Sequence, residues 1–278
     1  MSRRVRHGLL RISSMGISSM GIASLIGAAA FLWPFFIPAH QNVVSNSLAK
    51  MFSLVFVMIA LAQVFFSINA SLVDSKIVAL LGILIALDAA LRLMGAGAIG
   101  IEPMWFLLIL ASYVVGPMFG FALGSLSMAA SALITGGIGP WLPFQMFAAA
   151  WIGSGAGALS LLRLNEKNPR MERWLLALYG ICAAEFFGMI MDLQLWPWLL
   201  NTDTQLSYQP GASIASNVHR FIIFHFATSM AWNIPRAIVT AGLILFSSHA
   251  ILTALRRAQV KLTLPVMGQT AAIQLRKN

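Results

Sequence analysis

The sequence predicts an all-α integral membrane protein, and three observations support this prediction. The chain is 59% hydrophobic and only 9% charged over 278 residues, which is more apolar and less charged than a soluble domain. Several apolar runs approach or exceed the ~20 residues that a helix needs to cross a ~30 Å hydrocarbon core. The single cysteine, Cys182, lies within such a run, so the sequence predicts no disulfide framework.

Hydropathy along the chain predicts about eight spanning helices. They cover residues 13–37, 51–70, 77–95, 104–118, 119–135, 141–163, 174–197 and 231–255. The apolar stretch 213–230 is also expected to be helical. One helix over 213–255 would be ~60 Å long, about twice the core thickness, so we expect a break near Asn233 and Pro235. The stretch 213–230 then lies at the outer surface, or it spans as a ninth helix and moves the C-terminus to the other side.

The basic residues predict the orientation of these helices. Fourteen of the eighteen Lys and Arg residues fall on one side of the predicted topology, in the two terminal segments and in the loops 71–76 and 163–173. The connection 197–218 contains no Lys or Arg. By the positive-inside rule, we expect a multi-pass protein of the cell membrane with both termini in the cytoplasm and 197–218 outside. The net charge of +10 is therefore an orientation signal and predicts no nucleic-acid partner.

The N-terminal segment has two interpretations. Residues 1–40 could be a cleaved signal peptide, because basic residues precede an apolar stretch. That stretch is of spanning length and ends in "WPFFIPAHQ", without a clean small-residue cleavage site, so we favour retention as a helix.

Several motifs of soluble chemistry are absent from the sequence. There is no GxxxxGK[ST] phosphate loop, so the chain is not expected to hydrolyse ATP, and no GxSxG marks a nucleophile. The histidines show no tight metal-ligand spacing, so no metal or cofactor is predicted. His219 and His225 lie six residues apart, which turns them to different faces of a helix, and we interpret them as packing or interfacial residues.

Polar side chains within or beside the spans are the candidates for a site, because such groups are costly in hydrocarbon and must face a partner or a cavity. They are Asp88, Arg92, Glu102, Trp105, Trp141, Gln145, Glu185, Asp192, Asn233 and Arg236. A purely structural alternative is that Asp88 pairs with Arg92 within one helix and Asp192 pairs with Arg236 between helices. Trp196 and Trp198 are interpreted as interfacial anchors.

The third span has two distinct faces. Gly82, Ala86 and Ala90 recur every four residues, a pattern of small residues that lets helices approach closely. Asp88 lies about 200° around the helix from this stripe. One face can therefore meet another helix while the opposite face meets an internal cavity.

The stretch 112–159 carries a family resemblance. "SYVVGPMFGFALG" forms a turn between two spans, and "GGIGPWLPFQM" then leads into a glycine-rich helix. These residues resemble the substrate-binding subunit, or S component, of energy-coupling factor (ECF) vitamin transporters. The resemblance covers a six-helix core at 77–255. It leaves two additional helices in 1–76 and a basic cytoplasmic tail at 256–278.

The resemblance implies a transporter subunit and not an enzyme. A coupling transmembrane subunit and two ATPase subunits would supply the energy, while this chain would bind a vitamin at a pocket open to the outside. We expect the glycines and prolines of 136–143 to form a lid over that pocket. The implied solute is a cobalamin-like or other ring-containing vitamin. The candidate substrate-binding residues are Trp105, Trp141, Gln145, Asp192, Asn233 and Arg236, and the candidate docking residues for the coupling subunit are Gly82, Ala86 and Ala90.

Two other functions remain open on the sequence. An integral membrane enzyme acting on a lipid would usually show acidic metal ligands or a His–carboxylate set, whereas the acidic residues here are scattered over different helices. A structural membrane partner without a ligand would leave the ionisable groups in the spans explained by pairing alone.

Overall fold

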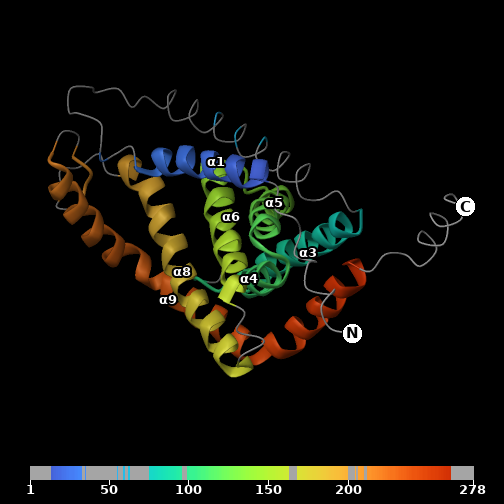
Figure 1. Cartoon of the computed structure of the whole chain (residues 1–278). Coiled ribbons are helices and arrows are strands. Elements are labelled where there is room, and N and C mark those ends of the chain that lie inside the picture. The colour runs from blue at the N-terminus through green and yellow to red at the C-terminus, as the bar shows by residue number, and fades with distance from the viewer. Residues whose placement is uncertain are drawn as a thin grey trace, which may run out of the picture.

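The computed structural model describes residues 14–32, 35, 55, 59, 62, 75–95, 99–162, 168–199, 204, 206–209 and 212–263. All regular structure within these residues is helical, which confirms the predicted all-α class (Figure 1). The helices are α1 (Ser14–Leu32), α3 (Ser75–Met94), α4 (Met104–Val115), α5 (Pro117–Thr135), α6 (Leu142–Leu159), the 3-10 turn η3 (Ser160–Leu162), α8 (Pro169–Leu199) and α9 (Ile214–Thr263). The predicted span 51–70 falls outside the described residues apart from isolated positions.

Five of these helices are long and apolar enough to cross a membrane: α3, α5, α6 with η3, α8 and α9. The membrane-spanning character is therefore supported, although not for all eight predicted spans. The predicted span 104–118 is instead the 12-residue helix α4, which is about 18 Å long and too short to cross the hydrocarbon core. The predicted span 13–37 corresponds to α1, Ser14–Leu32, while most of its remaining residues lie outside the described part.

Helix α4 lies at the centre of the packing. Every one of its residues except Phe106 is buried, because its sequence "MWFLLILASYVV" is apolar on all sides and no face favours water. The helix ends at Gly116, whose φ of 126° is a backbone conformation that glycine adopts readily, and Pro117 begins α5. The turn expected between two helices in "SYVVGPMFGF" is therefore present.

Helices α5 and α6 approach so closely that their backbones touch. A Cβ added to Gly120 would lie 2.3 Å from the carbonyl oxygen of Gly153, and one added to Gly124 would lie 2.2 Å from that of Ala149. Real side chains cannot occupy these positions, so the small residues permit the contact. The glycine-rich part of α6 is thus a helix-packing surface.

Helix α9 runs without a break from Ile214 to Thr263, so the predicted interruption near Asn233 and Pro235 is wrong. Its 50 residues correspond to about 75 Å, and Figure 1 shows that the helix changes direction along its length. A proline removes only one backbone hydrogen bond, and packing against neighbouring helices can keep the helix continuous. The stretch 213–230 is therefore the first part of α9 and not a separate helix.

Side-chain hydrogen bonds hold the ends of the long helices. Tyr113 donates a 2.8 Å hydrogen bond to Glu172 near the start of α8, and Arg256 of α9 bonds to the same carboxylate. Near the end of α8, Trp196 is completely buried and donates to the carbonyl of Leu206 at 2.7 Å. Its predicted role as an interfacial anchor is wrong, because it packs inside the protein; the side chain of Trp198 lies outside the described part.

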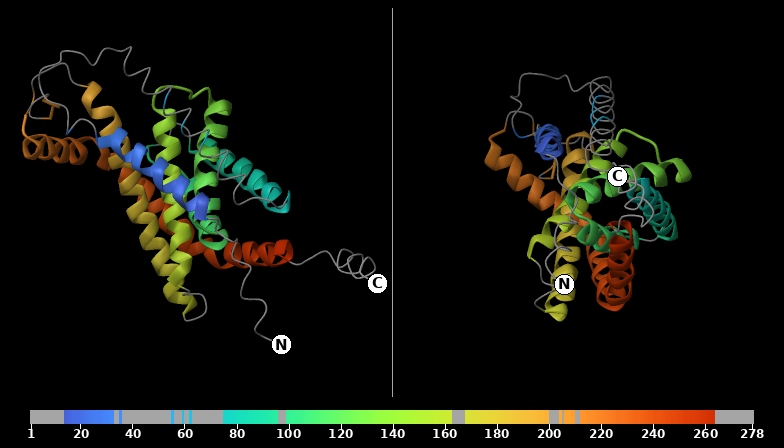
Figure 2. Two further views of the ribbon diagram at one scale, coloured as in Figure 1. Left: turned by 45° about the horizontal axis from the view of Figure 1, so that its top comes forward. Right: turned by 45° about the vertical axis from the view of Figure 1, so that its right-hand side comes forward.

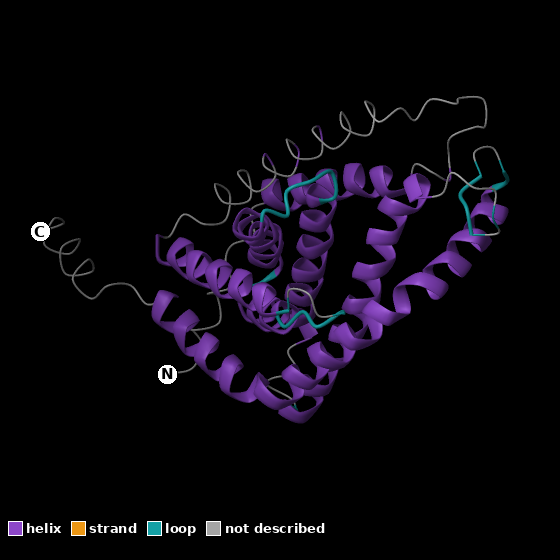
Figure 3. Cartoon of the chain, turned by 180° about the vertical axis from the view of Figure 1, so that it is seen from behind, coloured by secondary structure: helices purple, strands orange, loops and turns teal. Residues whose placement is uncertain are grey.

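Helix α1 crosses α6 and α8 and does not run alongside them (Figures 1 and 2). Trp151 of α6 donates to Ser24 at 3.0 Å, and Gly27 lies against the same indole. The described connections between helices are short loops (Figure 3).

The predicted two-faced character of α3 is confirmed. Gly82, Ala86 and Ala90 are exposed, and a Cβ added to Gly82 would meet nothing within 4 Å. Asp88 is fully buried on the opposite side, where α3 packs against α4 and α5. The small-residue stripe is therefore an open surface in this chain.

Candidate functional site

A pocket of about 290 Å³ opens between α8 and α9. Its polar lining includes Asp192 from α8 together with Ser229, Asn233 and Arg236 from α9. Three of the six predicted substrate-binding residues, Asp192, Asn233 and Arg236, are therefore brought to one cavity. The volume lies at the low end of the ~300–1,000 Å³ typical of small-molecule sites.

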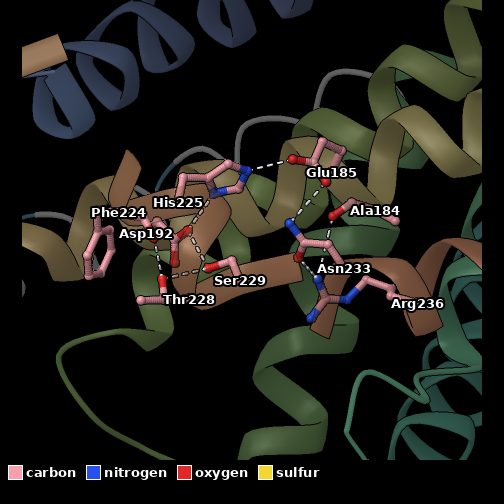
Figure 4. Close-up of polar contacts among 9 residues, drawn as sticks. All are labelled: Ala184, Glu185, Asp192, Phe224, His225, Thr228, Ser229, Asn233 and Arg236. Carbon is pink, nitrogen blue, oxygen red and sulfur yellow. Dashed lines mark hydrogen bonds and ion pairs between the residues drawn. The ribbon is translucent and has the colours of Figure 1, made fainter. Parts of the chain in front are cut away.

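The polar residues reach this site through helical periodicity. His225, Ser229, Asn233 and Arg236 follow one another at intervals of four, four and three residues, so they share one face of α9. On α8, Glu185 and Asp192 lie seven residues apart and also share a face. Figure 4 shows the two faces meeting, with the His225 ring between the two carboxylates.

His225 contacts a carboxylate through each ring nitrogen. Its Nε2 lies 2.5 Å from Glu185 Oε1, and its Nδ1 lies 2.6 Å from Asp192 Oδ2. Ser229 also donates to Asp192 Oδ2 at 2.5 Å. The imidazole is buried and stacks against the Phe221 ring, so the two carboxylates provide its polar contacts.

Arg236 is also held by several side chains. Its Nε donates to Glu102 Oε2 at 2.8 Å, and its Nη1 donates to Asn233 Oδ1 at 2.9 Å. The guanidinium carbon lies 5.0 Å from the centre of the Phe187 ring, a cation–π distance. Trp105 contributes indirectly, because its Nε1 donates to Glu102 Oε2 at 2.7 Å while its ring packs on Phe187.

One glycine in the loop that carries Glu102 lies directly against α9. Gly100 has a φ of 67°, and a Cβ at this position would lie 2.1 Å from the carbonyl oxygen of Trp232. Only glycine combines this conformation with such a close approach to α9. The contact brings Glu102 within reach of Arg236.

The electrostatics of Glu102 reflect opposing effects. Burial alone would raise the pKa of its carboxyl group. The charge of Arg236, the hydrogen bonds from Trp105 and Arg236, and the charge of Arg92 outweigh burial and hold the pKa below its ordinary value. Glu102 is therefore a carboxylate at neutral pH.

Asn233 links the two charged groups of the site. Its Nδ2 donates to Glu185 Oε2 at 3.1 Å, and its Oδ1 accepts from Arg236. The amide fits because Gly188 of α8 faces it: a Cβ added there would lie 2.1 Å from Asn233 Oδ1. Gly188 thus provides the space that this bridge needs.

Trp141 and Gln145 lie away from this pocket. Trp141 is 45% exposed and donates to the carbonyl of Gly137, while Gln145 Oε1 accepts from Arg92 at 3.3 Å. Arg92 also donates to Ser131 at 2.6 Å. The loop 136–141 therefore does not form the expected lid over the pocket between α8 and α9.

Neither predicted ion pair is present. Arg236 pairs with Glu102 and not with Asp192, and Arg92 bonds to uncharged side chains and not to Asp88. Among the described residues, both carboxyl oxygens of Asp88 are buried without a hydrogen bond of ordinary geometry. The pairing follows from the helix faces, because Asp192 turns toward His225 while Arg236 faces the loop before α4.

Sequence reasoning missed two contributors to the site, His225 and Ser229, although one signal could have found both. The spacing of His225, Ser229 and Asn233 indicates a single polar helix face. The predicted break at Asn233 divided this face between two elements and concealed it. Glu102 stands in a loop, where no periodicity applies.

No protein-family model, curated protein or solved structure matches this chain.

Proposed function

We propose that this chain is a membrane-embedded solute-binding subunit of the ECF type, which captures a small ring-containing micronutrient for uptake. The observation that supports this most directly is the pocket between α8 and α9. It places Asp192, Asn233 and Arg236 together in helices long and apolar enough to span a membrane. Polar and charged groups are costly in the hydrocarbon core of a membrane, and a cavity that binds a solute gives them a function there.

The pocket narrows the proposed solute. At about 290 Å³ it suits a small single-ring or fused-ring compound better than a corrinoid, whose macrocycle is far larger. Apolar side chains such as Phe187, Phe224 and Trp232 supply its walls, and a few polar groups can fix the orientation of a ligand. The micronutrient is therefore proposed to be a smaller one than cobalamin.

The open stripe on α3 supports the proposed partners. Gly82, Ala86 and Ala90 form an exposed surface of small residues on a membrane-length helix. Such a surface permits close packing with a helix of another subunit. We propose that the coupling transmembrane subunit docks here and that two ATPase subunits supply the energy.

The polar cluster also bears on the enzymatic alternative, because the acidic residues are not scattered as expected: Glu185 and Asp192 converge on His225. The order of contacts nevertheless runs Ser229–Asp192–His225–Glu185. A nucleophilic serine is activated by a histidine nitrogen, and here both nitrogens face carboxylates. The cluster suits binding better than acyl transfer.

Co-expression tests the proposal. The chain is produced with an ECF coupling subunit and its two ATPase subunits and is purified through a tag on the coupling subunit. A stoichiometric four-component complex is expected, and in proteoliposomes it should accumulate the solute that the chain retains, with ATP. Failure of the chain to join this complex contradicts the proposed function.

A further inference from the structure

His225, Glu185 and Asp192 together carry a net charge of their own. Each nitrogen of His225 lies within 2.6 Å of a carboxylate oxygen, so each of these two contacts requires one proton. If the imidazole holds both protons, its charge of +1 and the two carboxylates sum to −1. If one carboxyl group holds one of the protons, the imidazole is neutral and the remaining carboxylate again gives −1. This group of three residues is therefore an anion as a unit.

Neither nearby arginine contacts this group, and each is held by other side chains. Arg236 is neutralised by Glu102, so that pair adds no net charge. Arg92 bonds to Ser131 and Gln145, its charge also acts on Glu102, and it does not line the pocket. A ligand therefore meets the Asp192 carboxylate on the α8 side of the pocket and the Arg236 guanidinium, already paired with Glu102, on the α9 side.

Asp192 is the member of this group that lines the pocket. Asp192 Oδ2 accepts from both His225 and Ser229, whereas Asp192 Oδ1 has no hydrogen-bond partner among the described residues. Asp192 lines the cavity and Glu185 does not. Phe224 and Trp232 supply aromatic surface in the same cavity, and aromatic faces attract cations.

We propose that the pocket takes a small ring-containing amine as its cation, with the charged nitrogen donating to Asp192 Oδ1 and the ring against Phe224 and Trp232. This inference rests on the proposed function and assigns the chemical class of its solute. Such a ligand cancels the charge of the group formed by Glu185, Asp192 and His225 and satisfies its open acceptor. The spare N–H groups of Arg236 can meet a neutral oxygen or ring nitrogen of the same molecule.

A matched series of indoles tests the charge of the ligand. Tryptamine, tryptophan and 3-indolepropionate present the same ring with a cationic, a zwitterionic and an anionic chain. Each is titrated into the detergent-purified full chain by calorimetry at pH 7. Tryptamine is expected to bind at least about tenfold more tightly than 3-indolepropionate, with tryptophan between them. Tighter binding of 3-indolepropionate, binding of tryptophan equal to that of tryptamine, or no binding of any of the three would overturn the inference.

Three variants test whether Asp192 is the residue that binds the cation. Asp192→Asn should weaken tryptamine binding about ten- to a hundredfold, because it removes a charged acceptor. Glu185→Gln removes an equal charge from His225 outside the pocket and should weaken binding much less; equal losses would contradict the role of Asp192. Asp192→Glu keeps the charge and should retain the preference for the cation, and loss of that preference in a folded Asp192→Glu protein would also contradict it.

The same measurements separate this inference from the proposed function. If the chain binds tryptamine through Asp192 but never joins a coupling complex, the proposed ligand class is supported and the proposed transport function is contradicted. If the chain assembles with the coupling complex and takes up an anionic solute, the transport function is supported and the proposed ligand class is contradicted.

Discussion

Arg236 and Glu102 are separated by 134 positions in the sequence, and their side chains meet at 2.8 Å. The contact ties the middle of α9 to the loop between α3 and α4. Because Arg236 also lines the pocket, this ion pair connects one wall of the pocket to the rest of the helical core.

Removal of Arg236 should destabilise the protein. Arg236→Gln leaves Glu102 without its main counter-charge, and the loss is expected to be about 1–3 kcal/mol. This is below the ~3–5 kcal/mol of a fully buried pair, because the Glu102 side chain remains 25% exposed. Urea unfolding in detergent gives the value. The double variant Glu102→Gln, Arg236→Gln should recover part of the loss, whereas strictly additive losses would show that the two residues act independently.

The same pair predicts a pH dependence. The pKa of Glu102 is lower in the folded protein than its ordinary value of 4.5. The stabilisation is therefore fully present above about pH 4.5 and is lost as the pH falls through the folded pKa. Melting temperatures from pH 7 to pH 3 should fall more steeply for wild type than for Glu102→Gln. Parallel curves would contradict the assignment.

Gly188→Ala should disturb the pocket. The added methyl group would overlap the Asn233 amide, which then cannot bridge Glu185 and Arg236. We expect a loss of about 1–3 kcal/mol in stability and weaker solute binding. Gly242→Ala on α9 is the matched control, because a Cβ there meets nothing within 4 Å and alanine favours a helix. Equal stability and equal solute binding in the two variants would contradict the role of the Asn233 bridge.

Bulk on the open face of α3 should impair assembly. Ala86→Leu and Ala90→Leu are expected to reduce co-purification with a coupling subunit while solute binding is preserved. Ala250→Leu, at an exposed position of α9, is the control for added surface bulk. Wild-type complex formation by both α3 variants would exclude this face as the docking surface.

The orientation can be measured by cysteine labelling in a Cys182→Ser background. A membrane-impermeant maleimide added to intact cells should label Asn201→Cys, in the connection predicted to lie outside, and should not label Asn168→Cys. Labelling after cell disruption confirms that both thiols are reactive. The reverse pattern would invert the predicted topology.

The helices that sequence reasoning placed well are those with uninterrupted apolar runs. The predicted 119–135 and 141–163 agree closely with α5 and α6 with η3, because hydropathy changes sharply at Gly136 and beyond Leu162. α8 begins five residues before its predicted start at 174, since a helix can continue into a charged region that hydropathy excludes. α4 shows the opposite error: apolar composition identified the helix but did not distinguish a buried core helix from a span.

The site was predictable only in part, for a related reason. Asp192, Asn233 and Arg236 were found because charged and amide groups are conspicuous in apolar segments. Their partners depend on which helix faces meet, and this is decided by tertiary packing. Asp192 and Arg236 look like a natural pair in the sequence, yet each bonds to a different residue.

The central claim is that a small solute occupies the pocket between α8 and α9, and the most direct test is mass spectrometry of the solute retained by purified protein. Met191 lines this pocket, so Met191→Trp should fill it, while Met189→Trp places the same bulk at an exposed position of α8. Wild type and Met189→Trp are expected to retain one small compound in stoichiometric amount, and Met191→Trp is expected to lose it. Equal retention by Met191→Trp, or no retained compound in wild type, would contradict the account.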